Sequence, residues 1–424
     1  MSERVTPVFK LDNPIRNYAW GSYDGLKDWA GIKTDGAKPS AECWMGAHPE
    51  APSSLALPGG SSLTSGSILS LTKYIHDYPM KSLGEEVFAE FGDLPFLFKA
   101  LSASMPLSIQ VHPDKARAKA GFDREEKLRV PRMASERNYK DRNHKPELAV
   151  ALSPFSALCG FRPANEAVEM LGFELCELFG FSADDAEASL RRLLRKALAS
   201  RDKERTLLES KATSRARELA KSADEKARIA GETTLMCFQH YPHDPGAISP
   251  LFMNVLYFKP GQGVYIPAGV MHAYLKGTIL EIMATSDNVI RGGLTHKHID
   301  VDDLLGSLDF RAEPIFIEPQ SSTSDAREVF WPTPASEFSL SRFGLSDQKR
   351  ADVKPSGPEI LLCTEGTVSI DCVSGANPPI VLKRGESAFI SASCKSYSLR
   401  GTSTVYRAHV GSFESSQGVP EGAL

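Results

Sequence analysis

The sequence predicts a mainly β protein with packed antiparallel sheets, such as jelly rolls, and one helical insertion. Short apolar runs bounded by Gly, Pro and Ser, typical of strands, fill residues 1–162 and return after the insertion. Residues 163–245 instead carry apolar side chains at helical spacing. We therefore expect one β domain formed jointly by residues 1–162 and 246–310, a helical domain at 163–245, and a second β domain at 311–424.

Three runs in the first part read most clearly as strands, namely residues 94–99, 107–112 and 147–152. The helical insertion has a start at Pro163 and another at Ser182, where Ser-Ala-Asp-Asp is a good capping sequence. Leucines recur at helical spacing after it, and the basic residues among them indicate the solvated face of an amphipathic helix rather than an anion site.

Composition narrows the class of protein. The chain of 424 residues is long enough for two or three domains, and its net charge of -4 gives no field that would attract nucleic acid or an anionic membrane. No stretch approaches the roughly 18 apolar residues of a membrane span. The seven cysteines are scattered without a Cys-x-x-Cys pair, and the N-terminus lacks a secretory pattern. We expect a cytoplasmic protein with no nucleic-acid or membrane partner.

Polar residues alternate with apolar ones in Ser108-Ile109-Gln110-Val111-His112. On a strand, Ser108, Gln110 and His112 share one face, and a polar inner face needs partners. A metal is one such partner. Glu147 directly precedes the apolar part of another strand, so its carboxylate could reach a metal beside His112. Each signal is weak alone, because a structural role explains either of them equally simply.

A third pattern is more specific. Gly261, Pro267, Gly269 and His272 form a Gly-x5-Pro-x-Gly-x2-His sequence that resembles the second motif of the cupin superfamily. The Pro and Gly make a tight turn between two strands, and the His then points into the barrel.

The first cupin motif is altered here, since Gln110 and His112 replace its usual His-x-His and Glu147 lies further along the chain. With His272 the set offers two imidazoles, one carboxylate and one carboxamide. Two His and one carboxylate are a common zinc set, and a neutral Gln leaves the site more cationic, which suits stabilisation of an oxyanion.

The chain resembles the type I mannose-6-phosphate isomerase family along nearly all of its length. The matching blocks occur in the family's order at residues 17–21, 41–46, 94–99, 106–113, 143–147, 160–163, 268–277 and 286–297. The resemblance implies two cupin-like jelly rolls with a helical domain between them, and one Zn²⁺ per chain held by Gln110, His112, Glu147 and His272. It also implies that Arg291 is catalytic. The implied substrates are mannose 6-phosphate and fructose 6-phosphate, in a step that feeds mannose into GDP-mannose synthesis; we expect a monomer.

Such an isomerase moves a proton between C2 and C1 through a cis-enediol, so it needs a base and a group that stabilises negative charge. Arg291 suits the second role. Two residues are candidates for the base: Glu281, for which a structural salt bridge is an equal alternative, and His144, because an imidazole in general titrates near neutral pH. Tyr274 either hydrogen-bonds the sugar or is a core tyrosine, and Asp287 is either catalytic or a loop cap.

Phosphate binding requires local cations and donors. Lys99, Lys145, Lys297 and Ser108 lie within the family blocks. Among them we favour Ser108 and Lys297, for each of which an ordinary surface or structural role is an equal alternative. The other histidines, His48 among them, show no ligand-like pattern, so packing or surface roles are expected.

Two rival functions remain open from the residues. His112, Glu147 and His272 would also suit the iron of a cupin oxygenase, although Gln110 and the basic residues speak against it. A non-catalytic bicupin that stores or senses sugars is the other. The residues beyond 310 show no chemistry, and we expect them to form a structural jelly roll.

Overall fold

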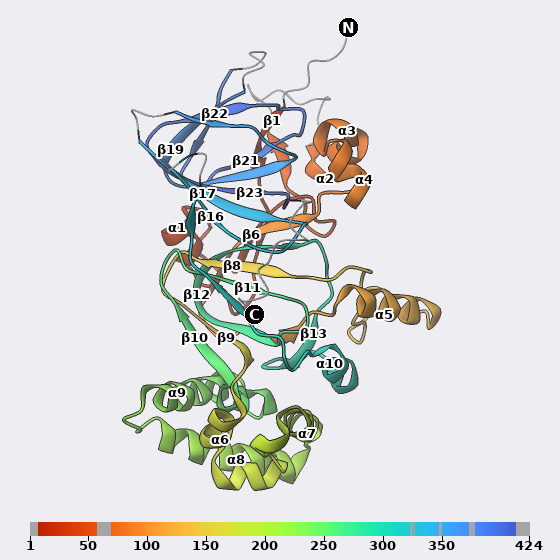
Figure 1. Cartoon of the computed structure of the whole chain (residues 1–424), viewed down its shortest axis with the longest axis vertical. Coiled ribbons are helices and arrows are strands. Elements are labelled where there is room, and N and C mark those ends of the chain that lie inside the picture. Colours follow the sequence, from red (N-terminus) through yellow and green to blue (C-terminus); the bar gives the residue numbers. More distant parts are fainter. Residues whose placement is uncertain are drawn as a thin grey trace.

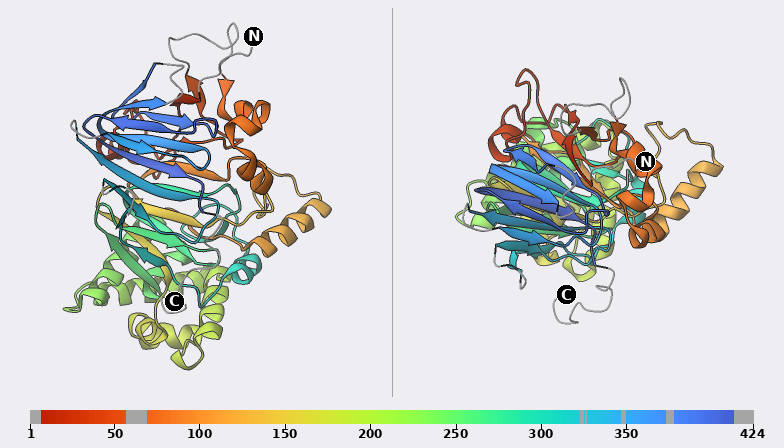
Figure 2. Two further views of the ribbon diagram at one scale, coloured as in Figure 1. Left: turned by 45° about the horizontal axis from the view of Figure 1, so that its top comes forward. Right: turned by 90° about the horizontal axis from the view of Figure 1, so that it is seen from above.

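The structure, a computed structural model, describes residues 7–56, 69–322, 325, 327–346, 350–372 and 378–412. It is elongated, with a β-sheet region from the C-terminal part at one end, a second β region in the middle and a group of helices at the other end (Figure 1). The left view of Figure 2 shows the same order, and the right view looks along the long axis from the end that carries the C-terminal sheet.

The middle region is built on one antiparallel network that has eleven strands among the described residues. Its main path runs β14-β11-β8-β12-β6-β3-β2, and β7, β9, β10 and β13 join it through β12. The strands are β2 (Ile15–Arg16), β3 (Glu42–Met45), β6 (Phe96–Ala103), β7 (Ile109–Val111), β8 (Glu147–Ala151), β9 (Phe155–Phe161), β10 (Met253–Phe258), β11 (Gly263–Ile266), β12 (His272–Ala284), β13 (Ile290–Gly293) and β14 (Ile315–Ile317).

Strand β12 serves two groups of partners. Its first residues, from His272, pair with β7 and β9, whereas the residues from Gly277 onward pair with β6 and β8. Gly277 has φ +119°, and a Cβ there would lie 2.5 Å from the carbonyl oxygen of Pro154. Only glycine adopts this backbone conformation here without strain. The position of Gly277 therefore sets the point at which β12 changes its pairing partners.

We expect Gly277→Ala to lower the free energy of unfolding by about 1–3 kcal/mol, because the new Cβ adds both a disfavoured φ and a backbone clash. Urea titration measures the change. Gly344→Ala is the matched control, since Gly344 also lies in a strand, has an ordinary φ and has nothing within 4 Å of the added Cβ. Equal stability of the two variants would contradict this account of the bend.

The C-terminal region has twelve strands among the described residues, along the path β15-β16-β17-β23-β19-β21-β1-β4-β5, with β18, β20 and β22 attached. They are β1 (Val8–Asp12), β4 (Ser54–Ala56), β5 (Leu69–Ser70), β15 (Gln320–Ser321), β16 (Glu328–Trp331), β17 (Ser339–Leu345), β18 (Ala351–Val353), β19 (Glu359–Cys372), β20 (Ile380–Lys383), β21 (Ser387–Ile390), β22 (Tyr397–Arg400) and β23 (Ser403–His409). Strand β1 pairs with β21, so the start of the chain is tied to this late sheet.

The predicted mainly β architecture with helices is confirmed. Pairings among the described strands leave both networks open rather than closed into barrels, so the expected barrel closure is not observed. The physical reason is that β12 and β19 each divide their pairing between two groups of strands, which stack instead of forming one ring. The jelly-roll detail and the domain boundaries stay predictions.

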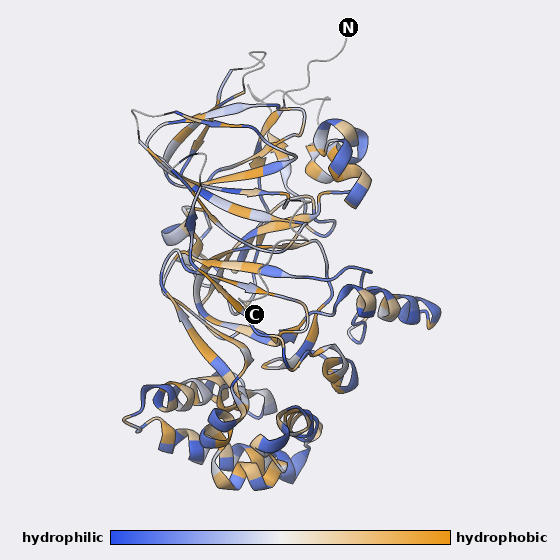
Figure 3. Cartoon of the chain, viewed as in Figure 1, coloured by the Kyte–Doolittle hydropathy of each residue, from blue (hydrophilic) through white to orange (hydrophobic). Residues whose placement is uncertain are grey.

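A group of helices lies between β9 and β10 in the chain. It comprises α6 (Ala164–Phe179), η2 (Ala183–Asp185), α7 (Ala186–Ala199), α8 (Asp202–Leu219), α9 (Glu225–His240) and η3 (Pro245–Leu251). The hydroxyl of Ser182 accepts a hydrogen bond from the backbone of Asp184, and the leucines of α7 are buried, as their spacing predicts. Hydrophilic and hydrophobic residues are interspersed along these helices (Figure 3).

The remaining helices are α1 (Gly25–Ala30), α2 (Leu71–Asp77), α3 (Pro79–Ser82), α4 (Glu85–Phe91), α5 (Lys115–Lys127) and α10 (Val301–Ser307). No helix in the described part of the chain is long and apolar enough to span a bilayer.

Candidate active site

Three buried side chains converge in the middle region. His112 Nε2 lies 3.2 Å from one carboxylate oxygen of Glu147, and His272 Nε2 lies 3.2 Å from the other. His112 follows β7, Glu147 opens β8 and His272 opens β12. Strand pairing brings them together, because β12 hydrogen-bonds both β7 and β8 and places His272 opposite Gln110.

Backbone carbonyls orient both imidazoles. His112 Nδ1 donates to the carbonyl of Asn288 at 2.7 Å, and His272 Nδ1 donates to that of Val270 at 3.0 Å. A carbonyl can only accept, so each Nδ1 carries the proton and each Nε2 presents a lone pair toward Glu147. This is the arrangement that metal-binding histidines adopt in proteins.

The donor set fits a divalent cation. The ligand atoms of His112, Glu147 and His272 lie within 4.8 Å of one another. His112 Nε2 and one oxygen of Glu147 are buried and have no hydrogen-bond partner among the residues that the structure describes. Such groups are costly unless something binds them. Gln110 Nε2 lies 3.2 Å from His272 Nε2, so all four predicted ligands meet. Gln110 would coordinate a cation through its side-chain oxygen. This requires the carboxamide group to flip, so that the oxygen replaces the nitrogen.

Lys145 balances the charge of the carboxylate. Its ammonium group lies 2.9 Å from Glu147, and both residues are buried. Burial alone would raise the pKa of Glu147, but Lys145 and His112 hold it well below its usual value. Burial, and then the charge of Lys145, lower the pKa of His112 to about 4. Both groups are therefore in the deprotonated forms that bind metals.

A second buried network adjoins this centre. The hydroxyl of Tyr274 donates to Glu281 at 2.6 Å, and Lys99 lies 3.6 Å from Glu281 and 3.8 Å from Glu42. Burial, and then the charge of Glu147, raise the pKa of Glu281. Both alternatives for Glu281 thus have a physical basis, because it forms the ion pair and also lies within the field of the metal-site carboxylate.

The remaining predicted residues lie around the same strands. Arg291 is half-buried on β13 directly opposite Gln110, and burial lowers its pKa. Ser108 is half-buried just before β7. Lys297 follows β13 and lines a cleft of about 590 Å³; burial, and then the charge of Arg291, lower its pKa.

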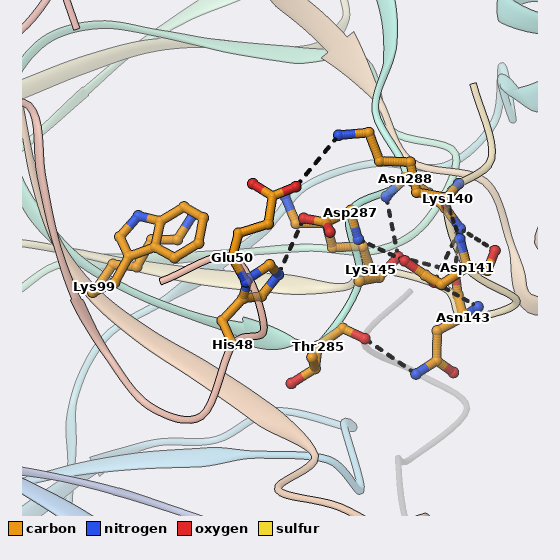
Figure 4. Close-up of polar contacts among 12 residues, drawn as sticks. His48, Glu50, Lys99, Lys140, Asp141, Asn143, Lys145, Thr285, Asp287 and Asn288 are labelled. Atoms are coloured by element: carbon orange, nitrogen blue, oxygen red, sulfur yellow. Dashed lines mark hydrogen bonds and ion pairs between the residues drawn. The ribbon is translucent and has the colours of Figure 1, made fainter. Parts of the chain in front are cut away.

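His144 and Asp287 have partners that their sequence positions did not indicate. His144 Nε2 contacts Glu337 of the C-terminal region at 2.6 Å. Asp287 lies 3.1 Å from Nε2 of His48, a buried residue for which a packing or surface role was expected (Figure 4).

Asn288 is a second residue that sequence reasoning missed. It is fully buried, its carbonyl orients His112, and its side chain hydrogen-bonds the backbone at Lys140, Asp141 and Asn143. The signal that could have revealed it is its position inside the family block at residues 286–297.

The fold and the site together define a metal-binding protein whose buried centre lies between antiparallel strands. Comparison with known proteins identifies the family to which the chain belongs. Residues 8–164 match the family model of the phosphomannose isomerase type I catalytic domain. The mannose-6-phosphate isomerase of Escherichia coli K12 is 38% identical over 94% of this chain and 99% of its own, and the human one is 33% identical over 93% and 96%.

Solved structures of phosphomannose isomerases also resemble this chain. A variant of the Salmonella typhimurium phosphomannose isomerase has a TM-score of 0.84 and 34% identity, covering 96% of this chain and all of its own. A zinc-bound mannose 6-phosphate isomerase has a TM-score of 0.83 with the same identity and coverage. The chain belongs to the type I phosphomannose isomerase family. This membership makes it an isomerase and speaks against both rivals, the iron oxygenase and the non-catalytic bicupin.

Proposed function

We propose that this protein interconverts mannose 6-phosphate and fructose 6-phosphate by proton transfer through a cis-enediol, and so feeds mannose into GDP-mannose synthesis. The observation that carries the proposal is the buried meeting of His112, Glu147 and His272, with Gln110 beside them, in a chain of this family. The cytoplasmic location and the monomeric state stay expectations from the sequence.

We assign one Zn²⁺ per chain to these four residues, supported by the unsatisfied nitrogen and oxygen at the centre and by the zinc-bound relative. Bound zinc would supply Lewis-acid stabilisation of negative charge on a substrate oxygen. Asn288 and Val270 hold the imidazoles in the required tautomer, and Lys145 keeps Glu147 ionised.

Arg291 would offset negative charge on the enediolate, because it lies opposite Gln110 and no carboxylate in the described part of the chain forms an ion pair with it. We favour Glu281 over His144 as the base that accepts the carbon-bound proton. Glu281 is buried beside the metal centre and has a raised pKa, which suits a base, whereas His144 is held by Glu337. Tyr274 would then position the Glu281 carboxylate through its 2.6 Å hydrogen bond.

For the phosphate we propose Ser108 and Lys297. Lys99 and Lys145 are buried and contact carboxylates, so their charges are already balanced. Lys297 forms no ion pair with a described carboxylate, and it lies near Arg291, whose charge lowers its pKa.

A coupled assay of fructose 6-phosphate formation tests the function. We expect protein purified without added metal to contain about one zinc per chain, to convert mannose 6-phosphate, and to lose turnover after chelation because two His, one Glu and one Gln are left without their cation. Added Zn²⁺ should restore turnover. Bound iron, or turnover that persists in the zinc-free protein, would contradict the proposal.

A further inference from the structure

The contact between His48 and Asp287 joins two loops that are far apart in the sequence. His48 follows β3, and Asp287 lies between β12 and β13, one residue before the Asn288 carbonyl that orients His112. His48 is only 4% exposed, and its ring packs edge-on against Trp44 with centroids 4.8 Å apart. Its orientation is therefore fixed by packing.

Local hydrogen bonding fixes the roles of the two ring nitrogens of His48. The backbone N–H of Glu50 donates to Nδ1 at 3.3 Å, so Nδ1 is the acceptor and Nε2 carries the ring proton. That N–H faces one carboxylate oxygen of Asp287 at 3.1 Å.

The other oxygen of Asp287 lies next to Arg132 rather than His48. Its nearest charged neighbour is Arg132, an exposed side chain 3.9 Å away. The backbone N–H of Asp287 donates to Asp141, and the charges of Lys140 and Lys145 also act on its carboxylate. Burial alone would raise the pKa of Asp287, but His48 and these lysines hold it below its usual value.

We propose that His48 is a positioning residue for the isomerase reaction: its Nε2–H holds one oxygen of Asp287, so that the other is presented to a hydroxyl of the sugar phosphate. This inference rests on the proposed function. Asp287 is the group that would touch the substrate, while His48 acts only through it. Hydrogen bonds from surrounding residues are a general means of holding a functional side chain in its working orientation.

Two substitutions separate this role from a merely structural one. In His48→Asn the amide oxygen can replace Nδ1 as the acceptor for Glu50, but the side chain is too short to reach Asp287. In His48→Gln the amide nitrogen can take the place of Nε2. We expect H48N to lower kcat by about tenfold or more with little change in KM, by analogy with outer-shell partners of functional groups, and H48Q to recover most of that loss.

The pH profile gives a second readout. Losing the donor destabilises the Asp287 anion and raises its pKa, so the acid limb of kcat should move to higher pH in H48N and stay near the wild-type position in H48Q. The double variant H48N/D287N should be no slower than D287N, because both changes act through one group. Zinc content should be unchanged throughout. His76→Leu, at an exposed His–Asp pair, is the matched control and should leave turnover unaltered.

An H48N variant with wild-type kcat and pH profile would overturn the proposal, as would an H48Q variant as slow as H48N or a loss that adds fully to that of D287N. The wild-type assay tests the function separately. The pKa of Asp287, measured by carbon NMR in wild-type protein and in H48N, tests the contact even if another substrate is the true one.

Discussion

Replacing Glu147 by Gln is expected to lower kcat/KM for mannose 6-phosphate by at least about 100-fold and to remove most of the bound zinc. Even outer-shell partners of a metal are worth about 10–100-fold, and Glu147 is the one carboxylate in the predicted ligand set. Its two oxygens face His112 and His272 at 3.2 Å each, so the change removes the negative charge between both imidazoles. Metal analysis and steady-state kinetics on the same preparation measure the two effects.

The same substitution leaves Lys145 buried without the carboxylate 2.9 Å away, which by itself costs about 3–5 kcal/mol of stability. His272→Ala separates the two causes, because it removes a ligand and keeps the Lys145–Glu147 pair. We expect H272A to lose zinc and turnover to a similar extent as E147Q but to unfold at a higher denaturant concentration. An H272A protein that retains full zinc and turnover would refute the ligand assignment.

Replacing Arg291 by Lys is expected to lower kcat by about 10²–10³-fold while the zinc content stays complete. A lysine keeps the charge but loses the planar fork with which a guanidinium can meet the two oxygens of an enediolate. Arg291 lies opposite Gln110 in the strand register but is not itself a metal ligand. Retained zinc therefore distinguishes a loss of charge stabilisation from damage to the metal centre.

Thermal unfolding provides the control for the Arg291 variant, since a half-buried arginine that forms no ion pair with a described carboxylate should contribute little to stability. A drop in kcat without a drop in melting temperature is the expected pattern. Near-normal turnover in R291K and in R291A would show that another group carries the developing charge.

Much of the site could be predicted because local sequence controls local geometry. Alternation along residues 108–112 places Gln110 and His112 on one face of a strand, and the turn chemistry around Gly269 delivers His272 to the start of the next. The helical insertion was equally readable, since the leucine spacing of α7 requires one buried side.

Other features could not be predicted, because they depend on contacts between segments that are distant in the sequence. The sequence left two roles for Glu281, a catalytic base or a member of a salt bridge. It does not reveal that Lys99 and Tyr274 both contact the Glu281 carboxylate. The split pairing of β12 is likewise a matter of which strands stack, and it replaced the closed barrel that the apolar runs suggested.

The sequence by itself determined the residue types of the candidate ligands, their placement at strand ends and the membership of a family, because these depend on residue identity and on spacing within short segments. Only the tertiary structure decided that His48 meets Asp287, that Asn288 orients His112 and that β1 joins the last sheet. Such contacts join segments distant in the chain, and their energies depend on the packing of the whole molecule rather than on any local pattern.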